Sequence, residues 1–273
     1  MSSFPHLKHE DTRRLVVSSL IILSIAIAGS FISTETAVIA TMVGAFTLGS
    51  LFVMHYHRET ANQQVSLAEH FQDLQFLQSQ LGLRKPLPYL TGWSASPALA
   101  SRLYSLIEEH KPACILELGS GVSTVVMAYA IQKVGVGKLV SMDHDATYAE
   151  KTRAELQRHQ LDHLVTILHT PLILTTTGGG GGSQPWYDLA QIQDVAPINM
   201  LIVDGPPLST CPDARLPAFE QLSGRLAPGC IVVIDDSIRS EEKSSLDAWS
   251  SACNVSRNED IPSEKGVSVR YLK

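Results

Sequence analysis

The sequence contains little cysteine and no paired cysteine motif. Its four cysteines, Cys114, Cys211, Cys230 and Cys253, are far apart, and none belongs to a CxxC pair. This spacing gives neither the usual zinc-ligand pattern nor a disulfide framework. Cys114 and Cys230 lie in apolar runs, where cysteine packs as a small hydrophobic residue. We therefore expect reduced thiols in a cytosolic domain.

Clusters of basic residues are also absent. Only 21 residues are Lys or Arg against 27 Asp and Glu, so the formal net charge is −6. A surface that binds nucleic acid needs concentrated positive charge opposite the phosphates. The composition therefore excludes nucleic acid as the partner.

Charge is missing from two long stretches near the N-terminus. Residues 15–32 and 36–54 contain no Asp, Glu, Lys or Arg. As a helix, each stretch would span roughly 27–30 Å, which is about the thickness of the bilayer hydrocarbon core. We expect residues 1–58 to be a membrane anchor with two transmembrane helices, at about 15–32 and 36–56.

The charges that flank these stretches predict the orientation of the anchor. Lys8, Arg13 and Arg14 precede the first stretch, Arg58 follows the second, and the loop carries only Glu35. By the positive-inside rule both ends face the cytoplasm. We therefore expect a multi-pass membrane protein whose larger domain lies on the cytoplasmic side.

Two alternatives to this membrane hairpin stay open. Arg13 and Arg14, followed by an apolar run and the small residues at 26–28, are also typical of a signal peptide. A cleaved signal peptide would leave the second apolar run, residues 36–54, without an environment that buries it. A buried helical hairpin of a soluble fold is less favoured, because both runs are apolar on all faces.

A different pattern begins after the second apolar run. Between residues 59 and 86 apolar side chains recur at helical spacing among Gln, Glu and Asp, and Pro86 follows. This predicts an amphipathic connector helix over 59–86. The helix either docks on the following domain or simply joins it to the anchor.

From residue 87 onwards, short apolar strands alternate with helices, which is typical of a parallel sheet covered on both faces. We expect strands at 113–118, 138–142, 165–169, 198–203 and 230–234, and helices at 98–110, 123–134, 146–159 and 214–226. Two further strands, 252–257 and 266–272, have no long helix between them and are expected to form a hairpin at the sheet edge.

The segment TTTGGGGGSQPWYD, residues 175–188, contains five consecutive glycines. Loops that bind phosphate have spaced glycines followed by a helix, so this run does not match them. We expect either a mobile loop over the site, with Trp186 and Tyr187 at its ordered end, or a disordered surface insertion.

The first strand leads into a glycine turn, ACILELGSGVSTVV, residues 113–126. The turn lacks the Gly-Lys-Ser/Thr ending of a Walker A loop, and Thr124 breaks the GxGxxG pattern. Glu117 would repel a pyrophosphate but suits a ligand with an amino group, such as S-adenosylmethionine. Asp143, at the end of the second strand, is placed to accept ribose hydroxyls, which NAD and S-adenosylmethionine share.

Five segments together resemble the class I S-adenosylmethionine-dependent methyltransferases of the small O-methyltransferase type. They are LELGSGVST (116–124), VSMDHD (140–145), LHTPLI (168–173), LIVDGPP (201–207) and APGCIVVIDD (227–236). The resemblance implies an α/β, Rossmann-like doubly wound seven-stranded sheet with an antiparallel last strand. It covers residues 87–273, while the membrane hairpin is not a general feature of the family.

The same resemblance implies how the cofactor S-adenosylmethionine is bound. Glu117, Gly119 and Gly121 would hold its methionine part, Asp143 the ribose, and the backbone at Thr170 would flank the adenine. Ser123 replaces a third glycine of the family pattern and is small enough for a close approach. The full expected set of cofactor-binding residues is Glu117, Gly119, Ser120, Gly121, Ser123, Asp143, His144, Thr170 and Asp204.

Three acids follow the fourth and fifth expected strands. Asp204, Asp235 and Asp236 are candidate ligands for a divalent cation such as Mg²⁺, which would lower the pKa of a substrate hydroxyl. Metal-dependent relatives of catechol methyltransferase usually have Asn where this chain has Asp236. Asp204 and Asp235 are the candidate catalytic residues. Alternatively, Asp204 anchors a turn and Asp235 caps a helix.

The sequence therefore predicts a membrane-anchored methyltransferase that modifies the oxygen of a small or lipophilic acceptor. One alternative is an NAD-dependent oxidoreductase on a similar sheet, although its Tyr-x-x-x-Lys motif is absent. Another is a non-catalytic membrane scaffold with the same fold. The sequence identifies neither the acceptor nor the general base, and it does not predict the oligomeric state.

Overall fold

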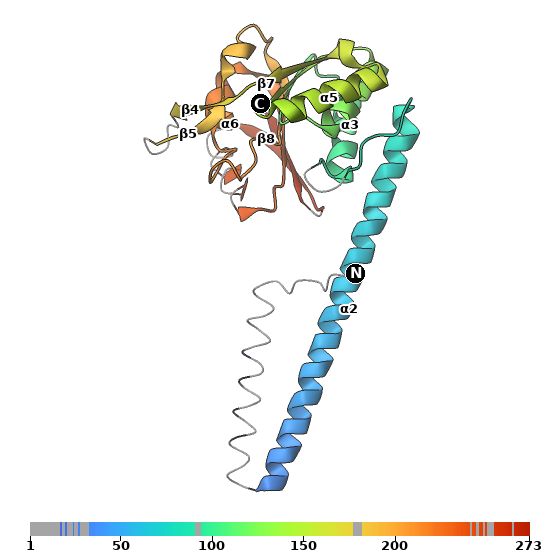
Figure 1. Cartoon of the computed structure of the whole chain (residues 1–273), viewed down its shortest axis with the longest axis vertical. Helices are drawn as coiled ribbons and strands as arrows, with labels where there is room; N and C mark the ends of the chain where they lie inside the picture. The colour runs from blue at the N-terminus through green and yellow to red at the C-terminus, as the bar shows by residue number, and fades with distance from the viewer. Residues whose placement is uncertain are drawn as a thin grey trace. The chain divides into compact units, whose positions relative to one another are not determined.

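A computed structural model of the chain describes residues 17, 20, 24, 27, 33–90, 94–176, 182–240, 242–243, 246–247, 249, 254–263 and 265–273 (Figure 1). The chain divides into two compact units, Met1–Leu67 and Ala68–Lys273. The first unit contains all of the expected membrane anchor, residues 1–58, and the second contains the expected catalytic domain, residues 87–273.

Helix α2 runs without a break over Thr34–Leu81, a length of 48 residues. It begins after Ser33, whose hydroxyl accepts a hydrogen bond from the Thr36 N–H at 3.2 Å. The helix joins the expected second apolar span to the expected connector, so no break in the helix separates them at residue 58. Sequence periodicity alone did not predict this continuity.

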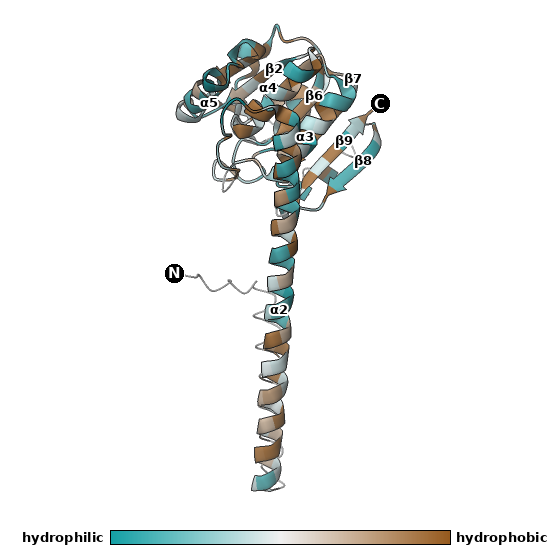
Figure 2. Cartoon of the chain, turned by 90° about the vertical axis from the view of Figure 1, so that its right-hand side faces the viewer, coloured by the Kyte–Doolittle hydropathy of each residue, from teal (hydrophilic) through white to brown (hydrophobic). Residues whose placement is uncertain are grey.

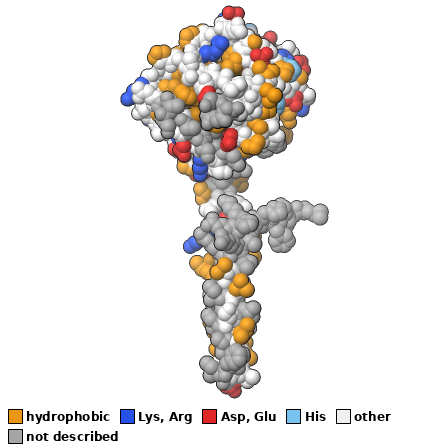
Figure 3. Space-filling model, turned by 90° about the vertical axis from the view of Figure 1, so that its left-hand side faces the viewer, with side chains coloured by type: hydrophobic (Ala, Val, Ile, Leu, Met, Phe, Trp, Pro, Cys, Tyr) orange, Lys and Arg blue, Asp and Glu red, His pale blue; other side chains and the backbone are white. Residues whose placement is uncertain are grey.

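The N-terminal half of α2 is apolar, as Figure 2 shows. Among the described residues, α2 is the one helix long and apolar enough to cross a membrane, with a mean hydropathy of 2.0 over its most apolar window. Met42, Val43 and Phe46 expose their side chains, and hydrophobic atoms follow the helix in Figure 3. The first expected span, 15–32, lies almost entirely outside the described residues.

The second unit is built on a seven-stranded sheet with the order β3-β2-β1-β6-β7-β9-β8. The first five strands in this order are parallel, and β9 is antiparallel to both of its neighbours. Their bounds are β3 Val165–His169, β2 Lys138–Asp143, β1 Cys114–Leu118, β6 Ile198–Val203, β7 Leu226–Asp235, β9 Val267–Leu272 and β8 Val255–Ile261. The predicted doubly wound sheet with an antiparallel last strand is confirmed.

Helices cover both faces of this sheet (Figure 1). They are α3 Pro97–His110, α4 Val122–Val134, α5 Ala146–His159 and α6 Pro217–Leu222, with 3₁₀ turns at Asp162–Leu164, Leu189–Ile192 and Ser223–Arg225. Side chains of β1 alternate between two cores: Ile115 packs with α3 and α4, whereas Leu116 and Leu118 pack on the opposite face. By the same alternation, Glu117 shares the face of Ile115.

The sheet order creates the crevice in which doubly wound folds bind ligands. From β1 the chain moves outward to β2 and β3, and then returns to the other side of β1 through β6. The carboxyl ends of β1, β2 and β6 therefore meet at one switch point. The predicted site residues follow these ends.

Two expected elements differ from the structure near residue 220. The helix expected over 214–226 is reduced to Pro217–Leu222, and the strand expected from residue 230 already begins at Leu226. Pro217 is in the first turn of α6, where its missing N–H costs nothing, and its ring prevents an earlier turn of helix. A 3₁₀ turn over Ser223–Arg225 then ends the helix.

The glycine-rich segment was expected to be a loop, and this expectation is corrected on both sides of the glycines. Strand β4, Leu172–Thr176, pairs antiparallel with β5, Ser183–Tyr187, over five residue pairs. Trp186 and Tyr187 are fully buried against the second core, which holds the hairpin on the domain. Residues 177–181 lie outside the described part of the chain.

Candidate functional site

The glycine turn after β1 passes directly against the turn after β6. Gly119 has φ +95°, and a Cβ added there would lie 3.3 Å from the carbonyl carbon and oxygen of Asp204. A Cβ on Gly205 would lie 3.3 Å from the Gly119 Cα. At Gly119 the positive φ favours glycine, and at Gly205 an added Cβ would also clash with the Tyr187 hydroxyl.

Glu117 is buried beneath this turn. Its two carboxylate oxygens accept hydrogen bonds from the Ser123 and Thr124 hydroxyls, each at 2.6 Å. Burial raises the pKa of Glu117 to about 7, although these two hydrogen bonds favour the ionised form. The carboxylate therefore ties β1 to the first turn of α4, rather than facing an open cavity.

Asp143 closes the turn from the side of β2. Its Oδ2 accepts hydrogen bonds from the Ser120 N–H at 3.0 Å and the Ser120 hydroxyl at 2.5 Å. Its Oδ1 accepts one from the Asp145 N–H at 3.0 Å. Oδ2 thereby uses both of its acceptor positions, whereas Oδ1 keeps one, which leaves room for a ribose hydroxyl.

A cavity of about 360 Å³ opens above the turn. Four of the predicted cofactor residues line it, namely Ser120, Gly121, Ser123 and Asp204; further lining residues come from α5 (Tyr148, Lys151, Thr152 and Glu155) and from Pro88, Tyr89, Ser94 and Ala95. No described atom lies within 4 Å of a Cβ added at Gly121, so the turn leaves open space there. The structure thus provides a cradle at the expected position.

The other five predicted cofactor residues lie outside the lining of this cavity. Glu117 is buried beneath the turn, Gly119 belongs to the turn itself, and Asp143 closes it from the side of β2. Thr170 is buried and donates its N–H to the Asp143 carbonyl at 2.7 Å. His144 lies partly exposed beside Tyr187, with 6.5 Å between the ring centroids.

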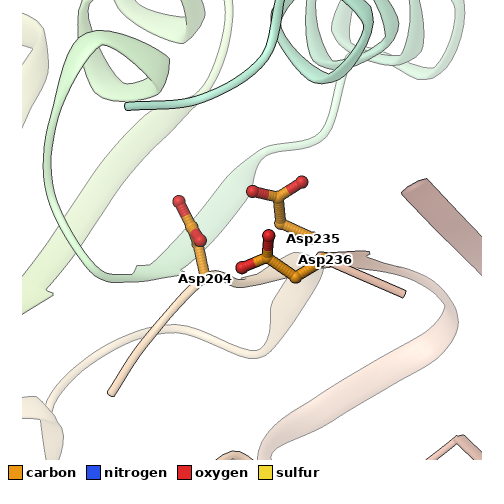
Figure 4. Close-up of side chains that lie close together, drawn as sticks. All are labelled: Asp204, Asp235 and Asp236. Atoms are coloured by element: carbon orange, nitrogen blue, oxygen red, sulfur yellow. The ribbon is translucent and has the colours of Figure 1, made fainter. Parts of the chain in front are cut away.

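The three predicted metal ligands come together at the ends of β6 and β7 (Figure 4). One carboxylate oxygen from each of Asp204, Asp235 and Asp236 lies within 4.8 Å of the others. Burial, and then the neighbouring carboxylates, raise the pKa of Asp204 well above its usual range and also raise that of Asp235. Of these three aspartates, Asp204 is the one that also lines the cavity.

Arg215 is the main residue of the site that sequence reasoning missed. Its guanidinium is 3% exposed and contacts Asp204 Oδ1 at 3.3 Å, Asp236 Oδ2 at 3.1 Å and Glu242 Oε1 at 3.5 Å. It also donates to the backbone carbonyls of Asp204 and Asp235, both at 2.9 Å. Arg215 lies in the irregular segment before α6, where no motif draws attention to it.

A comparison with protein families matches the part of the chain that contains this site. A family model described as "Methyltransferase domain" matches residues 116–237, from β1 to just beyond β7. This range includes the glycine turn, Asp143, Asp204, Asp235 and Asp236. No curated protein matches the chain.

Solved structures show the same fold at low sequence identity. The SAH-bound methyltransferase PaMTH1 of Podospora anserina is 13% identical, with a TM-score of 0.53 over 79% of this chain and 96% of its own. An O-methyltransferase of Bacillus cereus in complex with SAH is 18% identical, with a TM-score of 0.50 over 78% of this chain and 97% of its own. Residues 116–237 therefore match a methyltransferase domain, and the strand order of the sheet agrees with the fold that these two structures share with this chain.

Proposed function

We propose that this chain transfers a methyl group from S-adenosylmethionine to an oxygen atom of a small or lipophilic acceptor. One observation carries the proposal: within the region matched as a methyltransferase domain, the glycine turn and Asp204 line the same 360 Å³ cavity. The cofactor and a reacting hydroxyl would therefore meet beside a carboxylate.

The residues around the glycine turn fit the chemistry of the cofactor. The open space at Gly121 and the first turn of α4 would take the methionine part, which carries a carboxylate that a helix N-terminus favours. Asp143 would accept the ribose hydroxyls, and His144 and the backbone at Thr170 would flank the base. Glu117 would act indirectly, by holding Ser123 and Thr124 in place.

Asp204 is the best placed general base of the site. When bound, S-adenosylmethionine supplies an electrophilic methyl group on a positively charged sulfur. The acceptor hydroxyl would lose its proton to a carboxylate within reach as its oxygen bonds to that carbon, while the carbon–sulfur bond breaks and S-adenosylhomocysteine leaves. Asp204 is 19% exposed at the cavity, and burial raises its pKa, which makes its ionised form a stronger base. Asp235, which is buried beside Asp204, would act indirectly, because its negative charge raises the pKa of Asp204.

The membrane anchor is part of this proposal. The exposed apolar half of α2 supports a span at about residues 36–56, with the first span at 15–32 and the connector at 59–86 as the sequence predicts. Arg58 after the span favours a cytoplasmic position for the catalytic domain. An anchored enzyme of this kind is suited to acceptors that dissolve in the bilayer.

The cofactor proposal is tested by calorimetric titration of the full chain, in detergent micelles, with S-adenosylhomocysteine. We expect binding by the wild type and a roughly tenfold loss of affinity in Gly121→Ala, because the added methyl group enters the cradle. Gly224→Ala is the matched control, since no described atom crowds a Cβ there either and Gly224 is absent from the cavity lining. Equal affinities for the two variants, or no binding to wild type, contradict the proposal.

The acceptor class is tested by incubating the chain with labelled S-adenosylmethionine and a membrane lipid extract, followed by mass spectrometry. We expect a labelled methyl ether or ester in the lipid fraction, and at least a hundredfold lower rate for Asp204→Asn with little change in cofactor affinity. Cofactor binding with no labelled product from lipid or aqueous extracts would instead support the non-catalytic scaffold.

A further inference from the structure

A buried guanidinium lies where the three aspartates converge. Arg215 Nη2 alone reaches Asp204 Oδ1 at 3.3 Å and Asp236 Oδ2 at 3.1 Å. The same nitrogen donates to the Asp204 carbonyl at 2.9 Å, and Nη1 donates to the Asp235 carbonyl at 2.9 Å. One side chain therefore joins the ends of β6 and β7 and supplies positive charge to both.

A second arginine adds to this charge from the outside. Arg239 Nη1 lies 2.8 Å from Asp236 Oδ2, the oxygen that also pairs with Arg215. Asp236 is thus shared between two guanidinium groups, although its side chain is only 7% exposed. A buried charge needs compensation of this kind, because desolvation costs several kcal/mol per ion.

The donor atoms alone would suit a divalent cation, but their surroundings do not. Mg²⁺ requires oxygen ligands at about 2.0–2.1 Å in near-octahedral geometry. Here an oxygen of Asp204 and one of Asp236 already face a guanidinium, which stays protonated at any physiological pH. A cation among the three carboxylates would meet fixed positive charge at close range.

We propose that Arg215 takes the place of the divalent cation that the three aspartates would otherwise bind, so that methyl transfer by this chain needs no metal. The inference rests on the proposed function for what the cluster does in catalysis. Its claim about cation binding concerns Arg215 and the three carboxylates alone. An experiment that disproves the proposed function therefore leaves the claim about cation binding standing, and the reverse also holds.

The first test is a titration of the wild-type chain with Mn²⁺, followed by electron paramagnetic resonance of the free ion. We expect no binding at this cluster up to about 1 mM, and a thermal midpoint that 5 mM Mg²⁺ or EDTA leaves unchanged within about 1 °C. Binding in this range that Asp236→Asn removes would overturn the inference. Neither cofactor nor acceptor is needed, so the result is independent of turnover.

The second test removes the guanidinium. In Arg215→Met three clustered carboxylates lose their main counter-charge, so we expect a lower thermal midpoint that 5 mM Mg²⁺ raises by about 5 °C and EDTA lowers again. Arg225→Met is the matched control, because Arg225 donates to the carbonyl of Ile192 at 2.9 Å and not to the acidic cluster. We expect no Mg²⁺ effect on its midpoint.

A folded Arg215→Met chain without a Mg²⁺-dependent shift, or with the same shift as wild type, counts against the inference. If Arg215→Met does not fold, the wild-type titration decides alone. Arg215→Lys then supplies the intermediate case, since it keeps the positive charge but loses the paired geometry. A cation response of Arg215→Lys larger than that of wild type and abolished by Asp236→Asn supports the inference.

Discussion

Glu117 shows how a residue of the glycine turn contributes without facing the cavity. Residues 115 and 117 of β1 point to the face covered by α4, which brings the carboxylate under the first helical turn. The Ser123 and Thr124 hydroxyls then complete a buried three-residue network that orients the turn. The network fixes the position of Ser120 and Gly121, which do line the cavity.

The raised pKa of Glu117 predicts a specific pH dependence of stability. The folded pKa of about 7 exceeds the ordinary 4.5, so between these values the native chain holds a proton that the unfolded chain has lost. Stability contributed at Glu117 is therefore full below pH 4.5 and falls as pH rises to 7. Relative to Glu117→Gln, we expect wild type to lose about 3 kcal/mol of unfolding free energy over this window.

The measurement is denaturant unfolding of wild type and Glu117→Gln at pH 5, 6, 7 and 8. Glu109→Gln serves as the control, because the Glu109 side chain is 60% exposed and its curve should stay parallel to that of wild type. Parallel curves for wild type and Glu117→Gln would show that Glu117 does not titrate as its burial implies.

At the residue scale, the sequence predicted the positions of residues that local motifs place in the fold. Gly119 and Asp143 are where the pattern of strand, glycine turn and second strand places them, because both positions depend on a few neighbouring residues. Arg215 was not predictable in this way. Its partners are 11 and 21 residues away along the chain and meet it only after β6 and β7 pair. The only signal was a lone arginine near an apolar run.

Among the elements, the β4–β5 hairpin departs most from expectation. The glycine run suggested a loop, yet the residues on either side of it pair, and Trp186 is completely buried. Short strands flanking a low-complexity segment give too few residues for a periodic pattern to be recognised. The parallel strands of the main sheet were predictable because each is a short, largely apolar segment set between helical segments, a pattern typical of a sheet covered on both faces.

The hairpin is held to the domain by its buried face, which a pair of variants tests. We expect Trp186→Ala to lower the free energy of unfolding by about 3–5 kcal/mol, because it leaves a large cavity in the second core. Leu174→Ala, on the facing strand, should change it by less than about 0.5 kcal/mol, since Leu174 is 76% exposed. Chemical denaturation measures both, and similar losses would show that Trp186 does not anchor the hairpin.

For the whole molecule, the continuity of α2 links the two units through a single helix. The uncharged run of α2, residues 36–54, lies in its first half, whereas Leu77 and Leu81 near its end are buried in the core of the second unit. The sequence predicted both segments from their composition. It did not predict that they form one helix, because helix propensity is sufficient on both sides of residue 58 and no proline or glycine intervenes there.

The proposed anchor predicts that the full chain sediments with membranes and resists extraction by carbonate at high pH. A double variant, Val43→Arg with Phe46→Arg, places two charges in the apolar half of α2, each costing about 2.5–3.5 kcal/mol at the centre of a bilayer. If residues 15–32 also span, as the sequence predicts, the variant stays in the pellet. Release of the double variant from the membrane pellet would show that α2 alone anchors the chain. Leu67→Arg, outside the expected span, controls for the added charge and should stay bound, whereas a soluble wild type would contradict the anchor altogether.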